Sequence, residues 1–314
     1  MQTKRRLLFS TRRYDYLRQR VASAGEFELG RVERRTFPDG EHYQRILDDV
    51  DARKVVLVGG TVSDVDTLEV YDLASALVKY GAESLTLVVP YFGYSTMDRA
   101  VRHGDVVTAK TRARLLSSIP TPRHGFRIIL LDPHAEGLTY YFEGAITPVC
   151  VSAREVIKRA ARGLCADSFV LACTDAGRAK WVQSLADDMG VDASFVFKRR
   201  LNARRTELTA VSAHVEDQDV IIYDDMIRTG SSLITAARAY RDAGARTISA
   251  IATHGVFPGN ALASLKESGL FRKIICTDSH PRAVELTGDF LEVLSVGELL
   301  AGAIERRLYA TLTT

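Results

Sequence analysis

Residues 79–93 read KYGAESLTLVVPYFG, and residues 242–256 read DAGARTISAIATHGV. Each stretch runs from the end of an expected helix through a Gly-Ala pair into an apolar strand. The two pairs, at Gly81 and Gly244, lie 163 residues apart, about half of the 314-residue chain. Self-similarity at this spacing predicts two similar α/β domains in tandem. The alternative is coincidence, because a helix, a glycine and a strand follow one another in many α/β folds.

Short apolar runs alternate with helical segments along the rest of the chain. The expected strands are Val55–Val58, Leu85–Val89, Arg127–Leu131, Phe169–Cys173, Val220–Tyr223, Ile248–Thr253 and Lys273–Cys276, with a helix over 64–80. Continuous apolar strands between helices predict mainly parallel sheets flanked by helices. The expected domains are 1–150 and 151–294, and a C-terminal helix over 295–314 is expected to join the first.

Composition excludes several classes of protein. Hydrophobic residues make up 46% and charged residues 26%, which predicts a globular protein with a sizeable core. The net charge of +3, from 42 Lys+Arg and 39 Asp+Glu, does not point to nucleic acid as a partner. No apolar run approaches the roughly 18 residues of a membrane helix. With no signal peptide evident and no C-x-x-C pair, we expect a cytoplasmic protein whose four cysteines are buried and reduced.

The most specific motif is VIIYDDMIRTGSSL at residues 220–233. A buried strand ends in two carboxylates, which suit the neighbouring hydroxyls of a sugar or a hydrated Mg²⁺. A hydroxyl-rich loop and a helix N-terminus follow, and their N–H groups can cradle a phosphate. The alternative is a plain helix capped by Ser231. The predicted sugar-phosphate residues are Asp224, Asp225, Arg228, Thr229, Gly230, Ser231 and Ser232.

This motif resembles the phosphoribosyl-diphosphate (PRPP) loop of the phosphoribosyltransferase fold, and the whole chain is similar to the ribose-phosphate diphosphokinases, or PRPP synthases. The other matching segments are Phe37–Glu41, Pro90–Tyr94, Leu131–Glu136, Thr174–Lys180, Lys198–Arg200 and Ala252–Phe257. They occur in the family's order over roughly residues 5–306. The resemblance implies two phosphoribosyltransferase-like domains. It also implies transfer of a diphosphoryl group from ATP to ribose 5-phosphate, with AMP released.

Five cations crowd residues 198–205, directly after an apolar run. Such a run is usually a solvated surface, and nucleic-acid contact is another common interpretation. The nearly neutral chain and the resemblance favour a mobile loop that closes over ATP. We expect Lys198 and Arg200 to stabilise the transferring diphosphoryl group, as transition-state donors do.

The resemblance supplies the remaining site residues. His134 alone would more often be structural, but the family match implies contact with ATP and metal and a catalytic role. Asp175 is expected to hold Mg²⁺, and it could also cap the following helix. The ATP-binding residues implied are Phe37, Asp39, Glu41, Asp98 and His134. In the family the Phe37–Glu41 loop serves a neighbouring subunit, which implies a homo-oligomer with its active site at a subunit interface; this loop also matches an ordinary turn.

The chain departs from the commonest bacterial and animal form of the family. Thr96-Met97 stands where that form has Arg-Gln, Arg228 replaces an Asp, and Ser231-Ser232 replaces Gly-Thr. Residues 104–109 and 115–120 look more like the plant-type class II enzymes, described as broader in nucleotide donor and less dependent on phosphate. Two alternatives remain: a regulatory paralogue with little turnover, or a phosphoribosyltransferase that consumes PRPP. The nucleotide donor, the effectors, the subunit number and the pentose phosphate accepted stay open.

Overall fold

A computed structural model describes residues 5–306, apart from 166–167, 175, 203–204 and 212–213. The chain divides into two compact units. Unit 1 comprises Met1–Ser152 together with Ser295–Thr314, and unit 2 comprises Ala153–Leu294. None of the helices in the described ranges is long and apolar enough to span a membrane.

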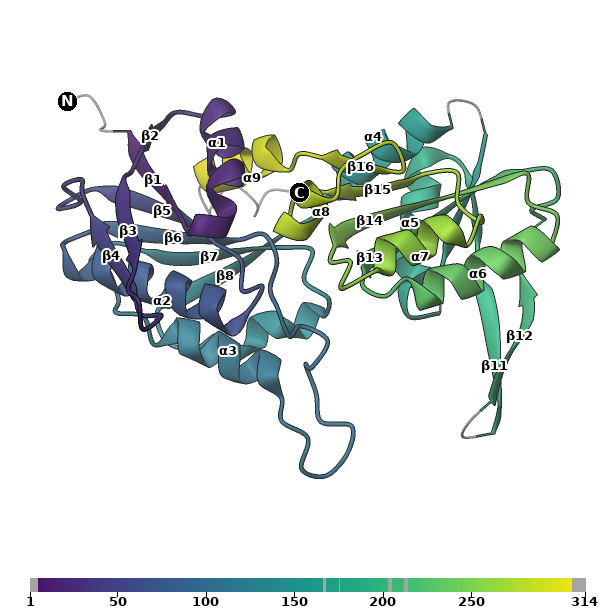
Figure 1. Cartoon of the computed structure of the whole chain (residues 1–314), viewed down its shortest axis with the longest axis horizontal. Coiled ribbons are helices and arrows are strands. Elements are labelled where there is room, and N and C mark those ends of the chain that lie inside the picture. The colour runs from purple at the N-terminus through teal and green to yellow at the C-terminus, as the bar shows by residue number, and fades with distance from the viewer. Residues whose placement is uncertain (1–4, 166–167, 175, 203–204, 212–213, 307–314) are drawn as a thin grey trace. The chain divides into compact units, whose positions relative to one another are not determined.

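Unit 1 is built on a six-stranded parallel sheet with strand order β2-β1-β5-β6-β7-β8 (Figure 1). Its strands are β1 (Arg6–Ser10), β2 (Phe27–Leu29), β5 (Lys54–Val58), β6 (Ser84–Val89), β7 (Phe126–Leu131) and β8 (Ile146–Val151). An antiparallel hairpin, β3 (Val32–Thr36) and β4 (His42–Ile46), is inserted between β2 and β5. The helices are α1 (Asp15–Ser23), α2 (Asp64–Lys79), α3 (Thr108–Ser117) and α9 (Gly297–Glu305), with short 3₁₀ turns at Arg12–Tyr14 and Glu136–Tyr141.

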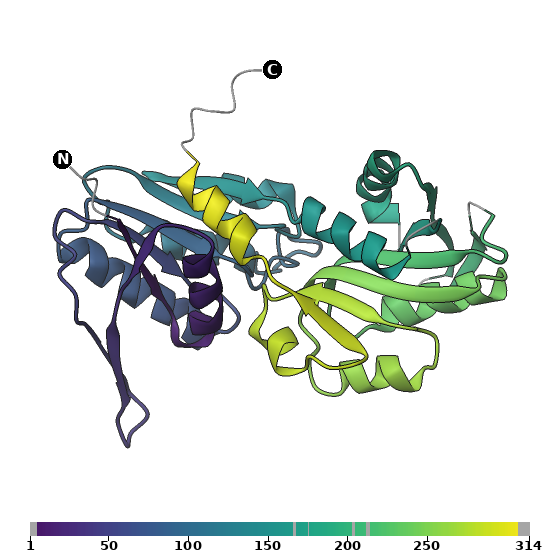
Figure 2. The ribbon, with the colours of Figure 1, turned by 90° about the horizontal axis from the view of Figure 1, so that it is seen from above.

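Successive side chains of a strand point to opposite faces of the sheet, and in these strands the side chains on both faces are mainly apolar. A sheet that is covered on both sides requires this pattern. One face packs a core with α2 and α3, in which Leu57 and Leu87 meet Leu73, Leu77 and Leu116. The helices α1 and α9 contact each other on the opposite face (Figures 1 and 2). The C-terminal helix α9 thus completes the first unit although it follows the second in sequence.

Unit 2 repeats this plan with strand order β10-β9-β13-β14-β15-β16. Its strands are β9 (Val170–Cys173), β10 (Asp192–Ser194), β13 (Asp219–Ile227), β14 (Thr247–Gly255), β15 (Ile274–Thr277) and β16 (Leu291–Leu294). A second inserted hairpin consists of β11 (Val196–Asn202) and β12 (Arg205–Val211). The helices are α4 (Arg154–Leu164), α5 (Ala179–Met189), α6 (Ser231–Asp242), α7 (Ala261–Glu267) and α8 (Pro281–Glu285), with a 3₁₀ turn at Ala176–Arg178.

The predicted fold class is confirmed: two α/β units each have a parallel sheet flanked by helices. Two local expectations are wrong. The cationic segment expected as a loop begins in strand β11, where the backbone of Lys198 to Asn202 pairs antiparallel with β12. Cys150 is exposed because it lies on β8, the edge strand of its sheet, whereas Cys165, Cys173 and Cys276 are buried.

Candidate functional site

The two predicted carboxylates lie toward the carboxyl end of β13. The body of this strand is buried on both faces, with Val220, Ile221 and Ile222 at most 1% exposed. Asp225 is only 3% exposed, whereas Asp224 is half-buried. The apolar strand therefore carries two acids to the edge of the sheet where ligands of open α/β sheets bind.

Groups from the segment after the neighbouring strand β9, and from β13 itself, hold these carboxylates. The Thr174 hydroxyl donates to Asp224 Oδ2 at 3.0 Å, and the Asp225 backbone N–H donates to Asp224 Oδ1 at 2.9 Å. Arg178 Nη2 lies 2.5 Å from Asp225 Oδ2. Burial, and then the hydrogen bond and negative charge of Asp225, raise the pKa of Asp224 to about 7. The pair therefore favours a proton, a cation or hydroxyl donors beside Asp224.

The helix that follows begins without a side-chain cap. Gly230 is the N-cap of α6, at a φ of 79°, and as a glycine it has no side chain to cap the first turn; the Ser231 N–H makes only a long contact, 3.5 Å, with the Thr229 hydroxyl. The alternative that Ser231 caps this helix is therefore wrong. Thr229 and Ser231 are exposed, with their hydroxyl oxygens 3.1 Å apart. The N–H groups at a helix start, with two hydroxyls beside them, can bind an anion.

Aromatic and hydroxyl groups fix the end of β13 from behind. The rings of Trp181 and Tyr223 stack with centroids 4.1 Å apart. The Tyr223 hydroxyl lies 3.2 Å from the Thr253 hydroxyl on β14, and Thr277 on β15 donates to the Thr253 carbonyl at 2.6 Å. These contacts link β13, β14 and β15 at the residue that precedes the acid pair, and they fix the backbone there.

In unit 1 the structure brings Asp98 and His134 near each other. A hydrogen bond from Arg99 is the largest cause that lowers the pKa of Asp98, and His134 adds to that lowering. Both residues are half-buried, and Tyr141 donates its hydroxyl to the Asp98 carbonyl at 2.5 Å. An imidazole can bind ATP phosphate or a metal, and a carboxylate can bind a metal or accept hydrogen bonds from the nucleotide.

The loop between β3 and β4 contains Phe37, Asp39 and Glu41. Its hydrogen bonds close a turn: Gly40 donates to the Phe37 carbonyl at 2.9 Å and the Glu41 N–H donates to Asp39 Oδ1 at 3.1 Å. Phe37 is 45% exposed, although its ring lies against Tyr43. The hairpin extends away from the sheet (Figure 2). An exposed aromatic ring with two exposed carboxylates can bind a flat nitrogenous base, as well as serve as a turn.

Three predicted residues fall outside what the structure describes. Asp175 is not among the described residues, and the N-cap of α5 is Arg178. Lys198 and Arg200 belong to β11, but only the backbone of that part of the strand is described. Their predicted roles therefore rest on the sequence alone.

Two residues of this site were missed as functional: Thr174, which donates to Asp224, and Arg178, which pairs with Asp225. Both belong to Thr174–Lys180, one of the segments that resemble the family. The signal that could have found them is their place after β9, because the ends of adjacent parallel strands meet at one edge.

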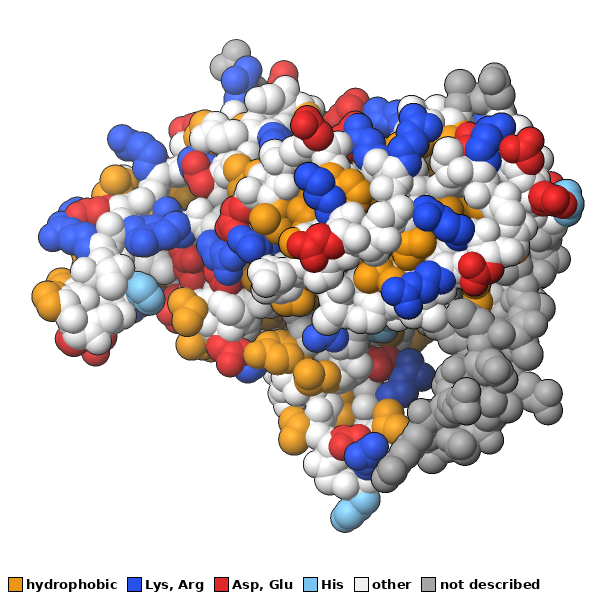
Figure 3. All heavy atoms as spheres, turned by 45° about the vertical axis from the view of Figure 1, so that its right-hand side comes forward, with side chains coloured by type: hydrophobic (Ala, Val, Ile, Leu, Met, Phe, Trp, Pro, Cys, Tyr) orange, Lys and Arg blue, Asp and Glu red, His pale blue; other side chains and the backbone are white. Residues whose placement is uncertain are grey.

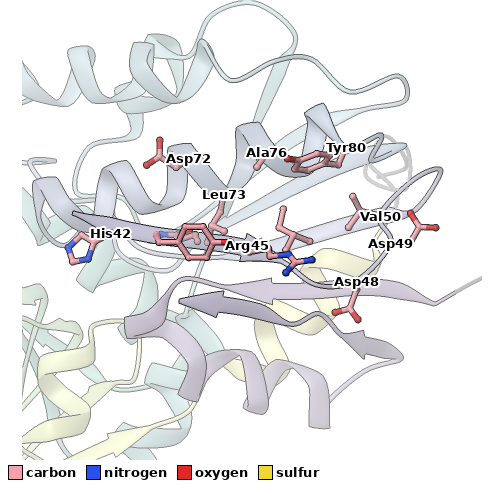
Figure 4. Close-up of a pocket in the computed structure, with 12 residues that line it drawn as sticks. His42, Arg45, Asp48, Asp49, Val50, Asp72, Leu73, Ala76 and Tyr80 are labelled. Atoms are coloured by element: carbon pink, nitrogen blue, oxygen red, sulfur yellow. The ribbon is translucent and has the colours of Figure 1, made fainter. Parts of the chain in front are cut away.

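A cavity of about 830 Å³ lies elsewhere, between β4 and α2 of unit 1. Figure 4 shows Asp72, Leu73 and Ala76 from the helix on one side and His42 and Arg45 from the strand on the other. None of the predicted substrate residues lines it, so volume alone does not locate the chemistry. Nor does any group of three or more His, Cys, Asp or Glu side chains in the described ranges form a metal-binding cluster.

Family models match two parts of the chain. Residues 6–119 match the N-terminal domain of ribose phosphate pyrophosphokinase, and residues 177–312 match the phosphoribosyl synthetase-associated domain.

Curated proteins match almost the full length. A ribose-phosphate pyrophosphokinase of Vibrio parahaemolyticus is 34% identical over 310 residues, covering 95% of each chain. That of Helicobacter pylori is 32% identical over 285 residues, covering 90% of this chain and 86% of its own. Among solved structures, the phosphoribosylpyrophosphate synthetase of Mycobacterium smegmatis has a TM-score of 0.83 at 26% identity, covering 96% of this chain and 98% of that one.

Proposed function

This chain belongs to the ribose-phosphate pyrophosphokinase family, and from that premise we propose that it transfers the β,γ-diphosphoryl group of ATP to the 1-hydroxyl of ribose 5-phosphate, giving PRPP and AMP. The observation that carries the proposal is the acid pair of β13 directly before the uncapped start of α6. A sugar phosphate carries a diol and a phosphate. The diol matches the two carboxylates, and the phosphate matches the helix start that follows them.

The ribose 5-phosphate site consists of the acid pair and the loop that follows. The sugar hydroxyls donate to Asp224 and Asp225, and the 5-phosphate accepts N–H groups of the loop and the first turn of α6. The exposed hydroxyls of Thr229, Ser231 and Ser232 add donors to the phosphate. Arg228 is also exposed, and its positive charge favours an anion at the same place.

Diphosphoryl transfer requires the sugar 1-oxygen to attack the β-phosphorus in line. The bond from the β-phosphorus to the α,β-bridging oxygen breaks, AMP leaves with that oxygen, and the sugar hydroxyl loses its proton. Such reactions depend on positioning and on neutralising charge rather than on covalent catalysis. The cations Lys198 and Arg200 of hairpin β11–β12 neutralise the transferring group as the transition state forms.

The ATP site draws on unit 1. Phe37, Asp39 and Glu41 bind the base, with the exposed Phe37 ring stacking on it. Asp98 and His134, which lie near each other, contact the rest of the nucleotide. The exposure of the base-binding hairpin agrees with its serving a second copy of the chain, so the active enzyme is a homo-oligomer with its site at a subunit interface.

Mg²⁺ suits these residues. It keeps several waters and binds through one or two carboxylates and substrate phosphates, so a dedicated cluster of protein ligands is not needed. His134 in unit 1 and Asp175 in unit 2 are each expected to bind the metal, and bound at either residue it would neutralise phosphate charge. The desolvated Asp224, whose pKa is already raised beside Asp225, likewise favours a nearby cation.

The partners are therefore ATP and ribose 5-phosphate, in the cytoplasm, without nucleic acid or membrane. Basic and acidic side chains are interspersed on the face in Figure 3, which agrees with the net charge of +3. Residues 104–109 and 115–120 support a finer assignment to the plant-type class II enzymes, with a broad choice of nucleotide donor.

The test measures AMP and PRPP formed from Mg²⁺-ATP and ribose 5-phosphate, with and without phosphate, beside GTP and CTP as donors. Equal amounts of AMP and PRPP are expected, without a need for phosphate and with more than one donor. A strict need for phosphate and for ATP would refute class II alone. Binding of ribose 5-phosphate without either product would instead favour a regulatory paralogue. Arg228 and Thr96-Met97 are the departures from the commonest form that suggest this alternative.

A further inference from the structure

Arg178 connects the segment after β9 to strand β13 of unit 2. It ends the 3₁₀ turn Ala176–Arg178 after β9, and its Nη2 lies 2.5 Å from Asp225 Oδ2 at the end of β13. The Arg178 side chain is 23% exposed and that of Asp225 is 5% exposed. The ion pair is therefore largely removed from water, where its geometry matters more than that of a surface pair.

The two carboxylates of the acid pair are held in different ways. Asp224 receives a neutral hydroxyl from Thr174 at 3.0 Å, whereas Asp225 receives a guanidinium. A guanidinium donates in a fixed, planar fork, so it fixes the orientation of the carboxylate that it binds. Asp225 is thereby oriented by protein, and Asp224 is the more exposed of the two.

Resting on the proposed function, we propose that Arg178 is a positioning residue: it orients Asp225 toward the ribose hydroxyls and docks the loop after β9 onto the end of β13. The acid pair and the segment after β9 are then positioned together by one side chain. Arg178 acts on the substrate through Asp225, so its loss weakens sugar binding more than it slows the bound reaction.

The matched control lies on the same strand. Asp219, the first residue of β13, pairs with Arg246 at 2.9 Å, at the end of the strand away from the acid pair. Arg246→Gln removes an Arg–Asp pair of β13 without touching the site. Any loss common to both variants reports on the strand rather than on the sugar.

The experiment compares Arg178→Gln, Arg178→Lys and Arg246→Gln by calorimetric titration with ribose 5-phosphate alone, by steady-state kinetics, and by thermal melting. For Arg178→Gln we expect a Kd and a KM for ribose 5-phosphate at least about tenfold higher, with kcat changed by less than about threefold; tenfold is about 1.4 kcal/mol of binding. Arg178→Lys should recover part of the affinity because the charge remains. Arg246→Gln should bind like the wild type.

An unchanged Kd in folded Arg178→Gln would overturn the proposal, as would an equal loss in Arg246→Gln. A fall in kcat at unchanged Kd would overturn it too, since Arg178 would then act on the diphosphoryl group itself. If Arg178→Gln does not fold, the Kd of Arg178→Lys takes its place, and a wild-type value there counts against positioning by the guanidinium fork. The titration uses no ATP, so absence of PRPP from the wild type would defeat the proposed function without removing this test.

Discussion

The two units have equivalent strand ends at the carboxyl edge of the sheet, but different residues stand at those ends. In unit 1, Val58 of β5 pairs with Ser10 of β1 and Val88 of β6. In unit 2, Tyr223 of β13 pairs with Cys173 of β9 and Ile251 of β14. By this register, Gly59 and Gly60 stand where unit 2 has Asp224 and Asp225.

The neighbouring positions show why one edge is closed. Thr11 follows β1 as Thr174 follows β9, and in the described part of unit 1 its buried hydroxyl has no hydrogen-bond partner, whereas Thr174 donates to Asp224. A Cβ on Gly60 would collide with the fully buried Tyr14 hydroxyl. Tyr14 thus fills the space at the edge of unit 1.

The helices after these strands differ in the same sense. Ser63 caps α2 by accepting the Asp66 N–H at 3.2 Å, whereas α6 starts at Gly230 without a side-chain cap. The hairpins inserted at equivalent places differ as well: β3–β4 carries an aromatic and acidic turn, and β11–β12 carries the cations. The shared frame alone therefore predicts no site; the proposed site rests on the acids, the helix start at Gly230 and the cations of unit 2.

The largest expected effect concerns the hairpins. Lys198→Ala should lower kcat by at least about 10²-fold, the scale of losing one transition-state donor. Arg45→Ala, an exposed cation of the other hairpin, is the control and should leave kcat within about threefold. Initial rates of AMP formation at saturating substrates measure both. Near-wild-type turnover in the Lys198 variant would contradict the catalytic role proposed for the hairpin β11–β12.

The acid pair gives the next effect, which depends on pH. The pKa of Asp224 is raised from 3.8 to about 7 in the folded state, so stability falls as pH rises from 4 to 7 and the full cost is present above 7. Asp224→Asn removes that cost, which we expect to be about 1–3 kcal/mol at pH 8. Since each kcal/mol corresponds to about 2–4 °C, the Tm at pH 8 should rise by a few degrees. At pH 4 the gain should vanish.

The control for this pH effect has the opposite sign. The hydrogen bond from Arg246 is the largest cause that lowers the pKa of Asp219, so this group contributes stability above its unfolded pKa and loses it as pH falls. Asp219→Asn should therefore lower the Tm at pH 8. Melting curves at pH 4, 6 and 8 measure both variants, and a Tm gain for Asp224→Asn that does not vary with pH would contradict the assigned charge.

How far the sequence predicted this comparison depends on the kind of signal. The buried strands were predicted because continuous apolar runs such as Val55–Val58 are legible without any tertiary information, and the Gly81 and Gly244 repeat correctly aligned β6 with β14. The strands of the first hairpin were missed, and of the second only the apolar start of β11, before Lys198, was predicted. VERRT and HYQRI are polar and half-exposed, so they lack an apolar run.

Within the candidate site, the acid pair and the loop were predicted because they are contiguous in sequence. The Arg178–Asp225 ion pair was not, because its partners lie 47 residues apart and meet only when β9 pairs with β13. The capping of α6 was also undecided from sequence. Both Gly230 and Ser231 are acceptable N-caps, and the backbone conformation decides between them.

The smallest expected effect separates the two helix starts with one serine each. Ser63→Ala removes the cap of α2 and should cost about 1 kcal/mol of stability, because the Asp66 N–H loses its acceptor. The Kd for ribose 5-phosphate should not change. Ser231→Ala removes an exposed hydroxyl that caps nothing, so the change in stability should stay within about 0.5 kcal/mol.

The two serine substitutions should therefore have opposite patterns: Ser63→Ala lowers stability only, and Ser231→Ala weakens ribose 5-phosphate binding only. Loss of a hydroxyl donor to a charged phosphate weakens binding roughly tenfold, so Ser231→Ala should raise the Kd for ribose 5-phosphate by about that factor. Melting and calorimetric titration on both variants complete the test. If Ser231→Ala melts early and binds normally, α6 is a capped helix like α2, and the anion lies elsewhere. If Ser63→Ala weakens sugar binding, the edge of unit 1 is not closed by Tyr14 and the two units are more alike than their contacts indicate.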